Sequence, residues 1–288
     1  MRHPASPSSA PPSSPVTPVV LCADDFAENA PISEGIAELA HAGRLSATSA
    51  MTLSPRWAPD ATLLAPLRDK MDVGLHLDWT SPFAIQAGHG LPLGQTMLQA
   101  ALGGMKPEQV RQVIDRQLGL FEDVWQAPPD HVDGHQHIHQ FAGIRQVLLD
   151  VLSQRYAAHQ RPYLRLSRAQ AGYASLKSRV IALWGAAPLV REAAQAGIPC
   201  APALSGIYGF EVAEGLYAQR MHQWLQQAQR GVLLMCHPAK AALPDDPIGP
   251  ARVQEHAYLA SPDFLQTLNA HGLVLSRGRN LYTDAPCA

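Results

Sequence analysis

Short apolar or alternating runs recur along the chain and are separated by longer segments with helical periodicity. The short runs are typical of strands because they are rich in β-branched and other apolar residues. They occupy residues 19–23, 46–53, 72–79, 130–134, 163–167, 231–236 and 272–276. About seven strands are therefore predicted.

Helical periodicity fills most of the intervals between these runs. The predicted helices cover residues 32–42, 57–68, 107–125, 144–157, 175–195, 215–230 and 261–272. The segment 107–125 has the clearest apolar face, with Val110, Ile114, Leu118 and Phe121 at helical spacing. Residues 80–105 are rich in Gly and Pro and predict a long loop with a short helix near 94–102.

Alternation of strands and helices on this scale predicts an α/β fold with a parallel sheet covered by helices. About seven mostly parallel strands fit a single-domain β/α barrel-like fold better than a small open sheet. Residues 19–288 are expected to form this one domain. Residues 1–18, MRHPASPSSAPPSSPVTP, lack an apolar core and the apolar region of a secretory signal, and predict a disordered tail.

The composition excludes several classes of function. The formal net charge of the 288 residues is −2, which argues against electrostatic binding to nucleic acid or to anionic lipid. No apolar run reaches the roughly 20 residues needed to span a bilayer. Cys22 and Cys236 lie in apolar runs, and no cysteine forms a C-x-x-C pair. Reduced thiols and a cytoplasmic location are therefore expected.

Ionisable side chains occur at or near the ends of several predicted strands. They are Asp24, Asp25, His76, His135, Arg165 and His237. In parallel α/β folds the chemistry lies at the carboxyl ends of the strands, which meet at one rim. We therefore expect these side chains to lie together.

Two histidines and one carboxylate form a typical site for a divalent transition metal with open coordination positions. A bound metal lowers the pKa of its water and polarises a carbonyl group. Asp24 and Asp25 are neighbours on an extended segment and should point in different directions. One of them can therefore bind the metal while the other acts as a base.

Other interpretations of these residues remain open. Asp24 and Asp25 could cap a helix N-terminus, His76 could be a hydrogen-bonded core histidine, and His237 could be a loop residue. The cluster HVDGHQHIH (131–139) is harder to explain in such terms. Five of its polar residues share one parity, namely His131, Asp133, His135, His137 and His139. A full strand would put these five on one face, at high cost if that face were core. Either the strand ends near Gly134 or the face is a metal site; a surface histidine tract is the remaining alternative.

Several of these segments resemble the YdjC-like family of carbohydrate deacetylases, in the order and spacing found there. The matching segments are VVLCADDF, GRLSATSAMT, GLHLDWT, HVDGHQHIH, YLRLSR and LLMCHPA, within residues 19–239. The chain departs from the family in having Ala27, where Gly usually follows ADDF. The loop at 80–95 also differs, which leaves the identity of the sugar open.

The resemblance implies a β/α-barrel-like fold and a metal-dependent hydrolase that removes an N-acetyl group from a small-molecule carbohydrate. It implies one divalent metal ion, Mg or Zn, held by Asp25, His76 and His135. Asp24 would be the base and His237 the acid that protonates the leaving amine. Arg165 would orient Asp24 or contact the substrate. The oligomeric state is not fixed, and a homodimer is one option.

Two functions from other classes compete with this hypothesis. A non-haem Fe(II) oxygenase also uses two histidines and a carboxylate, although the β/α alternation argues against the antiparallel folds usual for such enzymes. Dependence on iron and oxygen would identify it. The other alternative is a sugar-binding protein without catalysis. The presence of both Asp24 and His237 argues against it, whereas binding without turnover would support it.

Overall fold

Parallel strands form the centre of the computed structural model, which describes residues 16–170, 175–282 and 287. The strands are β1 (Thr17–Phe26), β2 (Ala47–Ala50), β3 (Asp72–Leu77), β4 (His131–Gly134), β5 (Tyr163–Arg165), β6 (Cys200–Ala201), β7 (Leu204–Ser205), β8 (Leu233–Cys236) and β9 (Leu273–Leu275). Their order in the sheet is β6-β5-β4-β3-β2-β1-β8-β7, and β9 pairs with the beginning of β1. The pairs between these strands are parallel, as predicted.

An isolated bridge brings the two sides of the sheet together. The chain leaving β5 reaches Ala169, which forms a parallel bridge with Leu204 of β7. The Leu204 amide donates a 2.8 Å hydrogen bond to the carbonyl of Arg168. The sheet is therefore nearly closed into a barrel, and the predicted β/α-barrel-like fold is confirmed. The structure adds β6 and β7, whose two residues each are too few to show a periodic pattern.

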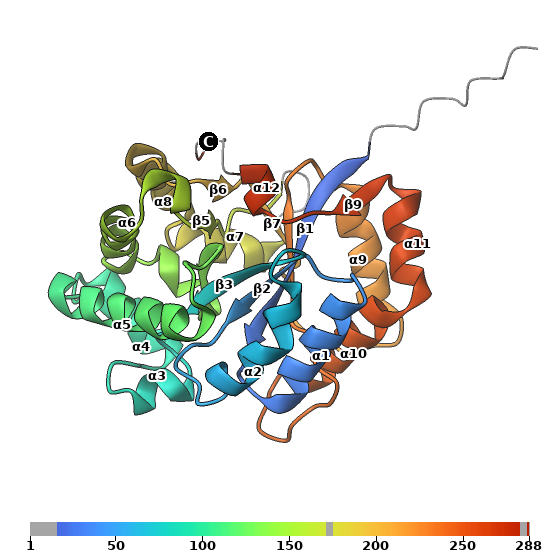
Figure 1. Cartoon of the computed structure of the whole chain (residues 1–288), viewed down its shortest axis with the longest axis horizontal. Helices are drawn as coiled ribbons and strands as arrows, with labels where there is room; N and C mark the ends of the chain where they lie inside the picture. Colours follow the sequence, from blue (N-terminus) through green and yellow to red (C-terminus); the bar gives the residue numbers. More distant parts are fainter. Residues whose placement is uncertain (1–15, 171–174, 283–286, 288) are drawn as a thin grey trace, which may run out of the picture.

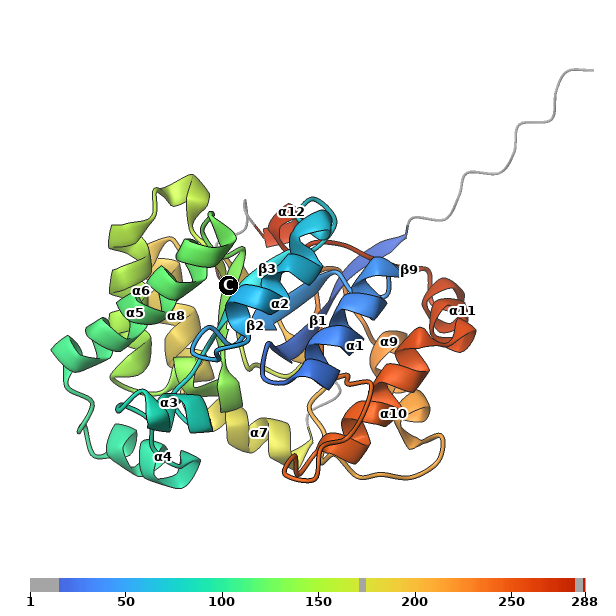
Figure 2. The same ribbon diagram turned by 60° about the horizontal axis from the view of Figure 1, so that its bottom comes forward.

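Helices surround this barrel on its outside (Figure 1). They are α1 (Ala30–His41), α2 (Trp57–Leu64), α3 (Pro82–Gln86), α4 (Leu93–Ala101), α5 (Pro107–Trp125), α6 (Ile144–Arg155), α7 (Leu176–Leu183), α8 (Ala186–Ala196), α9 (Leu216–Gln226), α10 (Gly249–Ala260), α11 (Pro262–Ala270) and α12 (Arg279–Tyr282). Short 3-10 turns cover Ala65–Leu67, His135–Gln140 and Ala158–Gln160. Figure 2 shows α3, α4 and α7 along the lower edge of the molecule, beside the carboxyl ends of the central strands.

The apolar face predicted for residues 107–125 is the buried face of α5. Val110, Ile114, Leu118 and Phe121 are all buried there, and the ring of Trp57 stacks on Phe121 at 5.3 Å. The single helix predicted at 175–195 is instead two helices. They are separated at Gly185, whose φ of 133° is one that side-chain-bearing residues rarely adopt.

Other differences from the predicted elements lie at the chain start and in two loops. Thr17 and Pro18 belong to β1 and not to the predicted tail, because they pair with Leu273 and Val274 of β9. Residues 1–15 of that tail lie outside the described residues. The segment predicted as a loop at 80–105 contains α3 as well as α4, and α10 occupies an interval for which no element was predicted.

The expectation that all cysteines are reduced thiols is wrong for one pair. Cys200 in β6 and Cys287 near the C-terminus form a disulfide. Cys22 and Cys236 are free and buried, as predicted from their apolar surroundings. Because disulfides are uncommon in the cytosol, this bond does not support the predicted cytoplasmic location. Among the described helices, none combines the length and the apolar composition needed to cross a membrane.

Candidate active site

A cavity of about 490 Å³ opens at the carboxyl ends of the barrel strands. Cavities of this size are typical of small-molecule sites. Its walls include every side chain that the strand-end argument singled out, namely Asp24, Asp25, His76, His135, Arg165 and His237. The prediction that these residues lie together is therefore confirmed.

The end of β1 delivers two aspartates to this cavity. The pairing of β1 with β2 shifts register between Ala23 and Phe26, which is the mark of a bulge. Asp24 and Asp25 lie in this irregular segment, and Asp25 has a left-handed φ of 68°. The bulge lets both carboxylates reach the cavity while remaining almost fully buried.

Ala27 stands in the same irregular segment with a φ of 72°. Glycine adopts this conformation readily, whereas a side chain makes it strained. The chain therefore carries alanine at a position whose positive φ favours the glycine usual in the family. The Ala27 amide donates a 3.0 Å hydrogen bond to the hydroxyl of Ser33, which helps hold this turn.

Asp25, His76 and His135 present one group of candidate metal-binding atoms. These atoms lie within 4.8 Å of one another. Asp25 Oδ1 is 3.1 Å from His135 Nδ1 and 3.3 Å from His76 Nε2. The other oxygen, Oδ2, accepts a 2.7 Å hydrogen bond from Arg252 Nη2. Arg252 thus leaves the other oxygen of Asp25 directed at the two histidines. This set of two imidazoles and one carboxylate oxygen fits a divalent metal ion.

Asp133 fixes the orientation of His76. Its Oδ1 lies 2.6 Å from His76 Nδ1, so Nε2 is the ring nitrogen that faces Asp25. Such carboxylate–histidine pairs are the usual support of a metal-binding imidazole. Burial favours the neutral ring, but the carboxylates of Asp133 and Asp25 outweigh it and raise the pKa of His76 to about 10. The site therefore favours positive charge at this position.

Arg165 connects Asp24 with Asp133. Its Nη1 lies 2.5 Å from Asp24 Oδ1 and 3.0 Å from Asp133 Oδ2. The guanidinium is 1% exposed, so these two carboxylates are its main polar surroundings. This arrangement favours the orienting role that the resemblance allowed for Arg165 over direct contact with a substrate.

His237 lies between two carboxylates. Its Nε2 is 3.8 Å from Asp24 Oδ2, and its Nδ1 is 4.0 Å from Glu255 Oε1. The backbone amide of His237 donates to Glu255 Oε2 at 2.5 Å, and the Tyr208 hydroxyl donates to Glu255 Oε1 at 2.5 Å. Burial lowers the pKa of His237 to about 4 despite the nearby carboxylate of Asp24. The resting ring is therefore neutral and must take up a proton before it can act as an acid.

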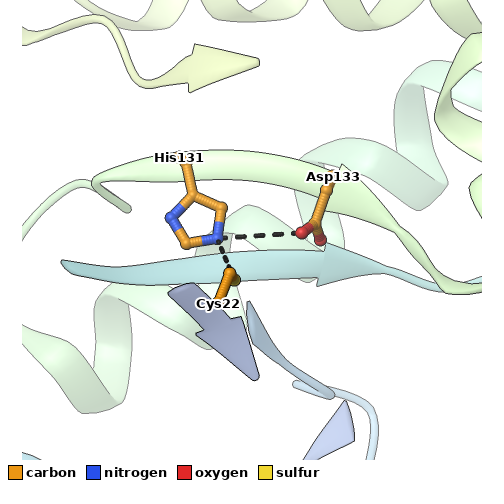
Figure 3. Close-up of side chains that lie close together, drawn as sticks. All are labelled: Cys22, His131 and Asp133. Carbon is orange, nitrogen blue, oxygen red and sulfur yellow. Dashed lines mark hydrogen bonds and ion pairs between the residues drawn. The ribbon is translucent and has the colours of Figure 1, made fainter. Parts of the chain in front are cut away.

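A second group of buried polar side chains lies in the barrel next to Asp133 (Figure 3). His131 Nε2 is 3.7 Å from both Cys22 Sγ and Asp133 Oδ2. The hydroxyl of Ser49 lies 3.0 Å from the same nitrogen and donates to Asp133 Oδ2 at 2.6 Å. Arg165 also contacts that oxygen, so its positive charge opposes a metal ion there. We interpret this group as hydrogen-bonded support for Asp133.

Sequence reasoning missed three supporting residues, Asp133, Arg252 and Glu255. Asp133 had a signal, because it shares the parity of the histidines in HVDGHQHIH. Arg252 and Glu255 lie three residues apart on α10, so both project from one face of that helix. No sequence pattern predicted α10, and therefore none pointed to these two side chains.

Comparisons with known proteins agree with this architecture. The sequence profile of the YdjC-like protein family matches residues 18–270. A chitooligosaccharide deacetylase of Serratia marcescens is 26% identical over 91% of this chain and 98% of its own length. A carbohydrate deacetylase of Mus musculus is 31% identical over 46% of each chain.

Among solved structures, a proposed cellobiose-phosphate cleavage protein of Enterococcus faecalis V583 superposes with a TM-score of 0.68. It is 18% identical and covers 93% of this chain and 99% of its own, which shows a shared fold. The family profile spans most of the barrel, including the segments that carry Asp24, Asp25, His76, His135, Arg165 and His237. The chain therefore belongs to the family of YdjC-like proteins.

Proposed function

We propose that this protein is a metal-dependent carbohydrate N-deacetylase that releases acetate from an N-acetylated sugar or sugar conjugate and leaves an amino sugar. The observation that carries the proposal is the meeting of Asp24, His237 and a three-residue metal-binding group in one cavity. The names of the relatives from Serratia marcescens and Mus musculus support the same reaction class.

Asp25, His76 and His135 would hold the divalent ion, Mg or Zn. A ligand set with two imidazoles favours a transition metal such as Zn over Mg, which prefers oxygen ligands. When bound, the ion supplies a Lewis acid that polarises a carbonyl group and lowers the pKa of water. Arg252 and Asp133 would keep Asp25 and His76 in position for this role.

Asp24 would act as the general base. Arg165 holds one of its oxygens, and the other faces His237. During attack on the acetamide carbonyl, Asp24 would accept a proton from water. Because His237 is neutral at rest, it would then receive this proton and pass it to the leaving amine. The C–N bond breaks in this step, and the protonated amine leaves as the amino sugar.

The alternatives receive less support. The barrel consists of parallel strands, whereas the oxygenase hypothesis would favour an antiparallel fold. A binding protein without catalysis has no need for a base held beside a second proton carrier. We therefore propose no second function.

The direct test measures acetate release from a panel of N-acetylated sugars by the purified, metal-analysed protein. We expect one equivalent of divalent metal and release that is lost after chelation and restored by adding the metal. Asp24→Asn is the matched inactive control. Absence of acetate release from every sugar by metal-loaded protein would refute the proposal.

A second experiment tests His237 as the proton donor. His237→Ala should strongly reduce the hydrolysis of an unactivated acetamide, because an amine leaves poorly without a proton. Hydrolysis of an activated acetyl ester should fall much less, since its alkoxide leaves without help, and metal content should not change. An equal loss on both substrates would indicate that His237 stabilises the oxyanion or the metal instead.

A further inference from the structure

His137 lies on the cavity wall but has no part in the metal-binding group or in the proton path. It follows β4 in the turn His135–Gln140, where Gln136 (φ 53°, ψ 29°) and His137 (φ 62°, ψ 23°) are both left-handed. Residues with side chains adopt this conformation at a cost, and such strain gathers at functional sites. The strained backbone marks this turn as a candidate functional segment.

The turn is anchored on both sides of the strained pair. His135 contacts Asp25 before it, and after it the imidazole Nε2 of His139 lies 2.8 Å from the carbonyl oxygen of Arg165. Ile138 and His139 are fully buried. The surrounding structure therefore dictates the backbone conformation at His137, and its side chain is held toward the cavity.

Ser167 fixes the ring of His137. The Ser167 hydroxyl is fully buried and lies 2.9 Å from His137 Nδ1. In the described part of the chain, this hydroxyl has no second hydrogen-bond partner. A buried hydroxyl hydrogen without an acceptor would be costly, so we assign Ser167 as the donor to Nδ1. With Nδ1 as the acceptor, the ring proton lies on Nε2.

The remaining polar atom of the ring faces open space. Nε2 of His137 forms no hydrogen bond within the described residues, and it is not among their buried unpartnered atoms. Because the ring is half-buried and lines the cavity, we place this nitrogen at the cavity surface. An N–H donor in a fixed orientation suits an uncharged oxygen acceptor, such as the acetamide carbonyl or a hydroxyl group of an N-acetylated sugar.

We propose that His137 is a substrate-binding residue that donates a hydrogen bond from Nε2 to an oxygen of the N-acetylated sugar, with Ser167 positioning its ring. This inference rests on the proposed function for the class of substrate. The proposed hydrogen bond acts in binding of the sugar, whereas the deacetylase proposal concerns the breaking of its amide bond.

The test measures equilibrium binding of N-acetylglucosamine and of its β-1,4-linked dimer to the metal-loaded protein by ligand-observed NMR. His137→Asn is the main variant, because asparagine tolerates the left-handed conformation but is too short to reach the same oxygen. Loss of one hydrogen bond should weaken binding about 2- to 10-fold while metal content and thermal stability stay unchanged. His159→Asn, at an exposed position in the turn Ala158–Gln160, is the matched control and should bind as the wild type does.

A double-mutant cycle separates this role from a structural one. Ser167→Ala should weaken binding in the wild-type background and have no further effect in the His137→Asn background, because it acts through the His137 ring. Additive effects, unchanged binding in His137→Asn, or loss of metal from that variant would each overturn the inference. So would failure of the wild-type protein to bind either sugar. Binding of the sugar without release of acetate would refute the deacetylase proposal and leave the role of His137 standing.

Discussion

Replacing Glu255 by glutamine tests how the surroundings of His237 sustain proton transfer. Glu255 is fully buried and accepts hydrogen bonds from the His237 amide and the Tyr208 hydroxyl. Glutamine has the same shape and can still accept from the amide while donating to the tyrosine oxygen. Glu255→Gln should therefore fold normally, and its main effect should be removal of a negative charge 4.0 Å from His237 Nδ1.

The size of the effect follows from that distance. Two unit charges at 4 Å interact by about 4 kcal/mol at an effective dielectric constant of about 20. This stabilisation applies to the imidazolium that forms when His237 takes up a proton. It corresponds to an upper limit of roughly 1000-fold in rate, and we expect kcat to fall at least about 10-fold. Substrate KM should change little, because the charge acts on His237 and not on the bound sugar.

The pH dependence gives the sharper measurement. Burial raises the pKa of Glu255 to about 7, so the carboxylate is neutral below this pH and charged above it. Wild-type kcat should therefore rise through a step near pH 7, and this step should be absent in Glu255→Gln. Tyr208→Phe removes a donor that favours the charged carboxylate, so the step should move to higher pH.

The assay is acetate release at saturating sugar between pH 5 and pH 9, with metal content and thermal stability measured for each variant. A Glu255→Gln protein that is folded, metal-loaded and as active as the wild type across this range would refute the reasoning. A retained step near pH 7 in Glu255→Gln would assign that step to another group.

The other predictions concern the metal site and the disulfide. Asp25→Asn should lower metal affinity together with activity, whereas Asp24→Asn should retain the metal and lose about 10²- to 10⁴-fold in turnover. Metal analysis together with kinetics distinguishes the two variants. The reverse pattern would exchange the roles of the two aspartates. Asp133→Asn should weaken metal binding about 10- to 100-fold in a competitive chelator titration, because His76 loses its orienting carboxylate. Thiol titration of denatured protein should find more free thiols after reduction than before it, and equal thiol counts would contradict the disulfide. Loss of the Cys200–Cys287 bond should lower the free energy of unfolding by about 2–4 kcal/mol in denaturant unfolding.

The fold was predictable where a pattern extended over several turns or a complete strand. Residues 107–125 have an apolar face over five turns, and the predicted bounds are those of α5. The strands β6 and β7 have two residues each and are held by neighbouring strands, so no local pattern could reveal them. The pairing of Cys200 with Cys287 depends on how β6 and the C-terminus meet in space, which their sequence separation of 87 does not indicate.

The candidate site was predictable to the extent that strand ends determine it. Asp25, His76 and His135 follow or end separate strands, and the parallel order of the sheet brings those ends together. The residues that orient them were not predictable in this way. Arg252 projects from a helix more than 200 residues beyond the aspartate it contacts, and only the closed barrel brings α10 beside the end of β1.

The buried charges of the site form one connected unit. Arg165 joins Asp24 to Asp133, and Arg252 holds Asp25, so three carboxylates share two guanidinium groups. The three carboxylates outnumber the two guanidinium groups by one negative charge, and Arg252 also contacts Glu28 and Asp246. This excess of negative charge suits a site that is to receive a cation. A buried charge that loses its partner costs several kcal/mol, so removing any member disturbs the rest. The effects of single substitutions on activity will therefore include changes in stability and metal affinity, and their sum will exceed the effect of removing the whole unit.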